Sequence, residues 1–202
     1  MKKASLLIAL AGLTAAAAAQ DFSLSIAGAP TTIDATNGAT ITIDIIGDST
    51  HGEVMMGGRF SMISGSGLIS NMTWTPAPWS AFNTDGGYAG NGDYNEVAFG
   101  QISHQGPQTA GSQLGMAIGS FQIQIAAGSF GVIDLEILGG LPFALETAFW
   151  PFDGFPTGGA VDVRDSSNGT LILNGASINV VPAPSALALL GLSGLAASRR
   201  RR

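Results

Sequence analysis

Oxygen-bearing side chains recur at alternate positions in the glycine-rich segment 73–105. Asn91, Asp93 and Asn95 have N-x-D-x-N spacing, and Asp85 lies a few residues before them. Calcium in proteins takes oxygen ligands of this kind. The EF-hand pattern is absent, because the sixth and twelfth positions of the loop lack the required Gly and Glu. A looser calcium site at these four residues is one hypothesis. A solvated polar turn, which we favour, is the other.

Aromatic side chains crowd into the same segment. Two of the three tryptophans, Trp74 and Trp79, lie there with both tyrosines, Tyr88 and Tyr94. Aromatic rings on a loop beside a rigid scaffold can stack on sugar rings, so one hypothesis is a carbohydrate-binding module that uses this loop. The alternative, which we favour, is that the tryptophans cap a hydrophobic core, as large aromatic side chains commonly do.

Residues able to catalyse a reaction are sparse. The chain has no cysteine, its only histidines are His51 and His104, and no G-x-S-x-G motif marks a nucleophile. Asp134 and Glu136 could serve as the paired carboxylates of a glycosidase, but their spacing puts both on the exposed face of one strand. We therefore predict that the chain is not an enzyme, and we keep a secreted hydrolase as a second alternative. No cofactor is predicted apart from the calcium ion.

The charges are distributed unevenly along the chain. All 14 acidic side chains lie between Asp21 and Asp165, against only Arg59 and Arg164, so residues 20–181 carry a net charge of −12. The other six basic residues lie in the two terminal segments. A surface of this charge repels nucleic acid and anionic lipid and favours cations, which excludes a nucleic-acid-binding role.

Strands are the elements that must position these residues, because apolar and polar side chains alternate with period two in several segments. The alternation is clearest in 40–46, 119–126 and 131–138. It predicts an inward face of Ile43, Ile123, Ile125, Ile133, Leu135 and Ile137, and an outward face of Gln122, Gln124, Asp134 and Glu136. Weaker candidate strands are 22–26, 59–63, 68–74, 96–102, 144–149, 160–164, 170–173 and 177–181.

Turn signals separate these strands, and no long segment of residues 20–181 has helical periodicity. Asn174-Gly175 lies between two of the candidate strands and predicts a hairpin with a two-residue turn. Many short strands with such turns are typical of two packed sheets. We predict an all-β fold, a two-sheet β-sandwich of the jelly-roll or cohesin-like kind, formed by residues 20–181 as one domain.

The N-terminal segment 1–19 has the features of a secretory signal peptide. Lys2 and Lys3 precede a short apolar stretch at 6–13, and the small residues at 15–19 suit cleavage between Ala19 and Gln20. The domain is therefore expected outside the cytoplasm. Because the chain has no cysteine, its stability there cannot come from disulfides and must come from its core or from bound ions.

The C-terminal segment 182–202 combines a Pro-x-Pro motif, an apolar stretch at 186–197 and a final cluster of arginines. Apolar segments that end in basic residues stop in a membrane with the basic residues inside, although this one is shorter than a comfortable span. A tail this short is expected to form a short C-terminal helix that serves as a temporary anchor and is later removed. The residues of the motif are Val181, Pro182, Ala183, Pro184, Ser185, Arg199, Arg200, Arg201 and Arg202.

This arrangement resembles the PEP-CTERM sorting signal of exported proteins in Gram-negative bacteria. The resemblance implies a transient stay in the inner membrane, processing by an exosortase-type enzyme, and delivery to the cell surface or extracellular matrix. The chain departs from the family pattern at Ala183, where the family typically has Glu, so an ordinary C-terminal membrane anchor remains the alternative.

The strand patterns at 35–45, 119–125 and 131–137 also resemble those of cohesin-type modules, from which no binding residue is carried over. Together these observations predict an exported cell-surface or extracellular-matrix protein with a structural or adhesive role. Extracellular polysaccharide is a candidate partner. The first alternative is the carbohydrate-binding module that uses the aromatic loop, and the second is the secreted hydrolase.

Overall fold

The computed structural model describes residues 20–101, 110–149 and 162–181. The predicted signal peptide at 1–19 lies outside the described residues, as do His104 and all of the predicted sorting segment 182–202. Val181, the first residue of the sorting motif, is the last residue of the final strand. Within the described ranges, the structure contains no helix that is long and apolar enough to cross a membrane.

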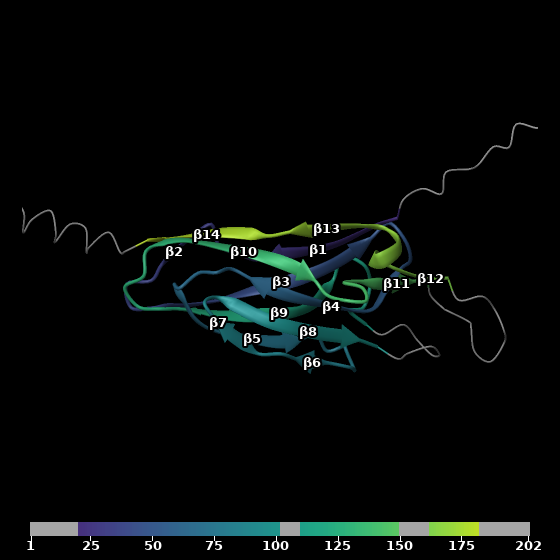
Figure 1. Ribbon diagram of the computed structural model, residues 1–202, viewed down its shortest axis with the longest axis horizontal. Helices are drawn as coiled ribbons and strands as arrows, with labels where there is room; N and C mark the ends of the chain where they lie inside the picture. The colour runs from purple at the N-terminus through teal and green to yellow at the C-terminus, as the bar shows by residue number, and fades with distance from the viewer. Residues whose placement is uncertain (1–19, 102–109, 150–161, 182–202) are drawn as a thin grey trace, which may run out of the picture.

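Two β-sheets pack face to face, as the alternation predicts (Figure 1). The five-stranded sheet has the order β13(Thr170–Asn174), β1(Asp21–Ala27), β3(Ala39–Ser49), β9(Ala117–Ile125), β5(Ile69–Pro76). The two-sheet sandwich is therefore confirmed. Each of the strands predicted from the sequence has a counterpart in the structure.

The second sheet has nine strands. Six follow the order β12(Val163–Asp165), β11(Glu146–Ala148), β4(Val54–Ile63), β10(Gly131–Gly139), β14(Ala176–Val181), β2(Thr32–Asp34). β8(Asp93–Gly100) pairs with β4, and the short strands β6(Thr84–Asp85) and β7(Tyr88–Gly90) pair with β8. β2, β6 and β7 were not predicted, because two or three residues are too few to show alternation.

The core lies between the two sheets and contains the inward residues that the sequence predicts. Ile43, Ile123, Ile125, Ile133, Leu135 and Ile137 are all buried, whereas Gln122, Gln124, Asp134 and Glu136 are exposed. β3 and β9 pair so that Ile43 faces Phe121 and Ile41 faces Ile123 across the strands. The outward residues of both sheets are thereby left facing solvent.

The predicted hairpin at Asn174-Gly175 is wrong, because the strands on its two sides belong to different sheets. β13 pairs in parallel with β1, and β14 pairs with β10, so the chain passes from one sheet to the other with β13 and β14 end to end (Figure 1). A Cβ atom on Gly175 would lie 2.3 Å from the carbonyl oxygen of Leu135. The glycine therefore permits a close approach to β10 instead of forming a tight turn.

β1 begins at one end of the sandwich and β14 ends at the opposite end (Figure 1). The pairing agrees, because Asp21 lies beside Thr170 whereas Val181 lies beside Asp34. The last described residue, Val181, thus lies at the end of the sandwich formed by β2 and β14.

Truncation of Leu135 to alanine tests whether the inward face is the core that holds the sheets together. Leu135 is 1% exposed, so Leu135→Ala is expected to lower the free energy of unfolding by about 2–5 kcal/mol in chemical denaturation. Its neighbour Glu136 is exposed and provides the matched control, Glu136→Ala, with an expected change within about 0.5 kcal/mol. Equal small losses in both variants would contradict the assignment of this face.

Candidate functional site

The aromatic residues of the segment 73–105 are mostly in the core. Trp74, Trp79 and Tyr94 are at most 5% exposed. The ring of Trp74 lies 4.8 Å from that of Phe121, and the ring of Tyr94 lies 5.0 Å from the same phenylalanine, measured between centroids. This burial agrees with the interpretation that the tryptophans cap the core. Stacking on a sugar needs open ring faces, which these three side chains do not offer.

The two tyrosines hold the loop to the sandwich by their hydroxyl groups. Tyr94 donates to Asp85 over 2.7 Å and accepts from the backbone N–H of Trp74 over 3.3 Å. Burial, together with the hydrogen bond to Asp85, raises the pKa of Tyr94 to about 12. Tyr88 is half-buried and donates to the carbonyl of Ile69 over 2.7 Å. Both phenols therefore have structural partners.

Of the four residues of the predicted calcium site, only Asn91 lies in a turn, whereas Asp85 is in β6 and Asp93 and Asn95 are in β8. Asp93 accepts the backbone N–H groups of Ser64 and Gly65, both over 2.9 Å, while Asp85 accepts Tyr94 and the N–H of Gly87. Asn95 donates to the carbonyl of Gly86. Asn91 has a left-handed backbone with φ of 57°.

The bond between Asp85 and the N–H of Gly87 is that of a polar turn, whereas Asp93 joins the start of β8 to the distant residues Ser64 and Gly65. Within the described residues, no group of three or more histidine, cysteine, aspartate or glutamate side chains could hold a metal ion. The calcium site stays a prediction.

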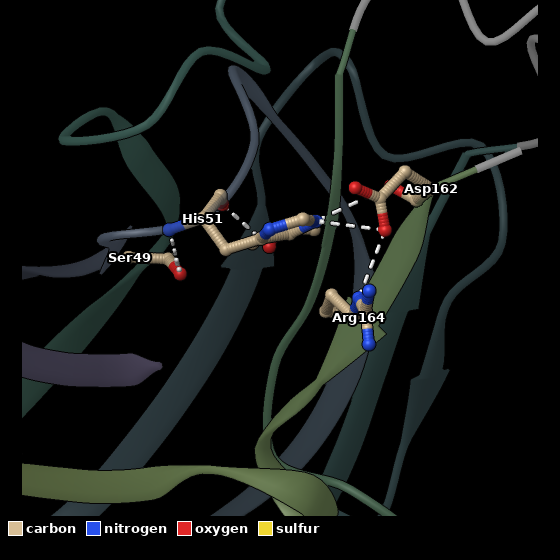
Figure 2. A network of polar contacts seen from close by, with 5 residues as sticks. Ser49, His51, Asp162 and Arg164 are labelled. Atoms are coloured by element: carbon tan, nitrogen blue, oxygen red, sulfur yellow. Dashed lines mark hydrogen bonds and ion pairs between the residues drawn. The ribbon is translucent and has the colours of Figure 1, made fainter. Parts of the chain in front are cut away.

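A polar network surrounds His51, the one histidine among the described residues (Figure 2). The His51 Nε2 atom lies 3.3 Å from the carbonyl oxygen of Asp162 and 3.8 Å from its carboxylate, which also accepts from Arg164 over 2.8 Å. Ser49 Oγ accepts the backbone N–H of His51 and does not contact the ring. The ring packs edge-on against Phe149. This network joins the turn before β4 to the start of β12. Among the described residues, no Ser or Thr hydroxyl is hydrogen-bonded to the imidazole ring, so these residues form no catalytic triad.

The more promising site is a groove on the outer side of the nine-stranded sheet, which we call the β4 groove. It has a volume of about 360 Å³ and a mostly apolar lining. β4 forms its floor, β8 and the segment before β6 form one wall, and the connection between β10 and β11 forms the other. The lining residues are 56–59, 82–84, 98–100, Pro142, Phe143 and Glu146.

Glycines explain how the connection comes so close to β4. β10 and β11 lie end to end along the same edge of β4, so the residues between them must fold against that strand. A Cβ atom on Gly58 would lie 2.0 Å from the carbonyl oxygen of Ala144, and one on Gly57 would lie 2.9 Å from that of Phe99. The Gly57-Gly58 pair therefore shapes the groove, because no larger residue fits between the strands.

Exposed apolar side chains border the β4 groove and continue along the sheet. Phe82 in the wall is 50% exposed, and Leu141 in the β10–β11 connection is 81% exposed. Leu138 and Ile63 are 57% and 36% exposed on the outer face of β10 and β4. Large apolar side chains in water near a concave surface are typical of interaction sites.

Charged groups on this face are placed at the two sides of the groove. Arg59 forms an ion pair of 3.2 Å with Glu96 on β8, where both side chains are open to solvent. Glu146 is half-buried and lies directly across from Asp165 in the β11–β12 pair. Burial raises the pKa of the Glu146 carboxyl, and the nearby carboxylate of Asp165 raises it further. No cation neutralises Glu146 within the described residues.

This arrangement can bind an apolar group in the groove and a cation at Glu146. Sequence analysis missed it, because the lining residues come from four segments that only the fold brings together. The Gly57-Gly58 pair was the one available signal, since two adjacent glycines inside a strand indicate a close approach of another backbone.

The fold is similar to that of solved cohesin modules. The seventh ScaB type I cohesin of Pseudobacteroides cellulosolvens superposes with a TM-score of 0.50 and 10% sequence identity, covering 82% of this chain and 94% of that chain. The cohesin–dockerin complex containing OlpA cohesin, from Clostridium thermocellum, gives 0.46 and 8%, covering 80% and 99%. A non-cellulosomal cohesin of Archaeoglobus fulgidus gives 0.43 and 7%, covering 85% and 97%.

No protein-family model matches the chain, and no curated protein matches its sequence. At such low identity the likeness to cohesins concerns the fold alone, and it confirms the cohesin-like sandwich expected from the strand patterns. Function must be argued from the site.

Replacement of Glu146 by glutamine tests the electrostatics of the groove. Folding raises the pKa of the Glu146 carboxyl above its value in the unfolded chain, which is near 4.5. The protonated carboxyl therefore contributes stability in full below pH 4.5, and this contribution is lost as the pH rises through the native pKa. Glu146→Gln is therefore expected to raise the free energy of unfolding at pH 7 and to have less effect below pH 4.5. Denaturant titrations at both pH values measure this. Glu136→Gln removes an equal charge from an exposed site and is the control. An identical gain in the free energy of unfolding in that variant would show that the gain comes from the lower net charge and not from the surroundings of Glu146.

Proposed function

We propose that this chain is an exported, non-enzymatic module of the bacterial cell surface or extracellular matrix that binds a protein partner through the β4 groove. The observation that carries this proposal is the groove itself. It is an apolar hollow bordered by Phe82 and Leu141, and the half-buried carboxyl of Glu146 lies at its edge. A cohesin-like sandwich supplies a rigid platform for such a surface. The fold supports the presence of such a platform and does not by itself identify what binds to it.

The chemistry of the groove defines the partner. Its lining fits an apolar side chain, and the domain carries a net charge of −12. Glu146 and Asp165 face each other as like charges, so a cation brought beside Glu146 would relieve their repulsion. We propose a protein that presents an apolar side chain next to a lysine or arginine. Complementary charge would also speed the encounter.

Export and delivery rest on the two terminal segments. We propose that residues 1–19 direct secretion and are removed, and that the segment 182–202 holds the protein briefly in the inner membrane until an exosortase-type enzyme processes it. Val181, which precedes this segment, lies at the end of the sandwich formed by β2 and β14, whereas β11 and the adjoining part of β4, which line the groove, lie toward the other end (Figure 1). The groove would therefore be held at a distance from the membrane while the tail is in place.

The other candidate functions have less support. A carbohydrate-binding module that uses the aromatic loop needs open rings, and Trp74, Trp79 and Tyr94 are buried. A secreted hydrolase needs a nucleophile or two carboxylates that face each other across a substrate. Asp134 and Glu136 border an open hollow of about 560 Å³, but both are exposed side chains of the same strand, β10.

The intact mass of protein extracted from the surface of its bacterial host tests the export proposal. The mature protein is expected to begin at Gln20 and to end near Pro182 to Ser185, because both terminal segments would have been removed. Replacement of Arg199 to Arg202 by neutral residues is expected to reduce retention in the inner membrane, since basic residues fix where a membrane segment stops. A mature protein that retains the four arginines would make the tail an ordinary anchor.

Site-specific photo-crosslinking in the host tests the partner proposal. A photoreactive residue in place of Phe82 is expected to give a discrete adduct with another protein, which the added change Glu146→Lys should remove by repelling the partner's cation. The same residue in place of Thr75, exposed on β5 of the opposite sheet, is the control. Adducts of equal yield from both positions, or none from position 82, would contradict a partner site at the β4 groove.

A further inference from the structure

The outer face of the five-stranded sheet differs in chemistry from that of the nine-stranded sheet. Strand pairing places Thr42, Gln122 and Thr73 in one row across β3, β9 and β5, and Thr40, Gln124 and Asn71 in the next. Five of these six side chains are exposed and Asn71 is half-buried. We call these two rows the polar face, in which neighbouring strands lie side by side about 4.8 Å apart.

The hydrogen-bonding groups of the polar face are free. Within the described residues, none of the six side chains forms a hydrogen bond or ion pair with another residue, which leaves three threonine hydroxyls and three amide side chains open across the strands. Hydroxyl and amide groups both donate and accept hydrogen bonds. The face thus offers a regular array of donors and acceptors to a ligand.

The polar face also lacks cations. Both arginines of residues 20–181 lie on the nine-stranded sheet, Arg59 in β4 and Arg164 in β12. The next row of the five-stranded sheet contains Asp44, which is exposed. An anionic polymer on the polar face would be repelled by the Asp44 carboxylate and by a domain of net charge −12, because the face has no basic side chain to neutralise it.

A hollow of about 400 Å³ extends the polar face at the end of the sandwich formed by β2 and β14. It shares Thr40 and Gln124 with the polar face and adds the side chains of Asn37 and Ser70. Its lining is mostly polar. The array of hydroxyl and amide groups therefore runs from the outer face of the sheet into a concave surface, in which a ligand can bury more of its own surface.

We propose that the polar face and this hollow bind a neutral polysaccharide chain. Sugar hydroxyls match the free hydroxyl and amide groups, and an uncharged polymer avoids the repulsion that an anionic one would meet. The face is on the opposite sheet from the β4 groove, so the proposal does not depend on the protein partner. With both surfaces occupied, the module would join a surface protein to matrix polysaccharide.

Affinity electrophoresis of the purified full chain tests the proposal, with hydroxyethylcellulose and dextran as neutral polymers and alginate as an anionic one in the gel. At least one neutral polymer is expected to retard the chain, and alginate is expected to have no effect. In the double variant Thr42→Ala with Gln122→Ala, each lost hydrogen bond is expected to weaken binding by up to about tenfold. Both positions are exposed, so the melting temperature should not change.

The double variant Ser177→Ala with Asn179→Ala is the matched control, because it removes two exposed polar side chains from β14 on the other sheet. It is expected to be retarded as strongly as the unchanged chain. Three results would overturn the proposal: no retardation by either neutral polymer, stronger retardation by alginate, or equal losses in both double variants. Failure of the β4 groove to crosslink a protein would leave this result unaffected.

Discussion

The packing of aromatic and aliphatic side chains between the two sheets is the constraint on which the rest of the structure depends. Phe121 is at its centre, with ring-centroid distances of 4.8 Å to Trp74, 5.0 Å to Tyr94 and 6.3 Å to Phe60. These residues come from β9, β5, β8 and β4, so one cluster joins both sheets. Because the chain has no cysteine, burial of these side chains must supply the stability that many exported domains obtain from disulfides.

This constraint also determines what is left for function. Since every second residue of a strand is committed to the core, the remaining residues form two outer faces that can differ freely. The outer face of the nine-stranded sheet has apolar side chains, an ion pair and the β4 groove, whereas the polar face of the five-stranded sheet has uncharged hydroxyl and amide groups. Two chemically distinct surfaces on one rigid domain suit a role in joining components of a surface or matrix.

The sequence predicts the parts of this structure that depend on local pattern. The alternation around Ile123 and Leu135 identifies both the strands and the buried face, because a strand with one solvated side must alternate. Pairing between distant strands carries no such signal. Asn174-Gly175 has the composition of a hairpin turn, yet its glycine is needed where the chain passes close to Leu135. The β4 groove and the rows of the polar face are likewise products of register, which local pattern does not specify.

Labelling of single-cysteine variants in intact host cells tests the central claim most directly, namely that this sandwich is displayed outside the cell with its outer faces open. The chain has no cysteine, so a membrane-impermeant maleimide can react only at the introduced residue. The account predicts that Asn179→Cys, which lies outside both proposed binding surfaces, is labelled on intact cells. The neighbouring native side chain Ile178 is 0% exposed, so Ile178→Cys is expected to be labelled only after denaturation. Labelling of Asn179→Cys only after the cells are lysed would contradict the account.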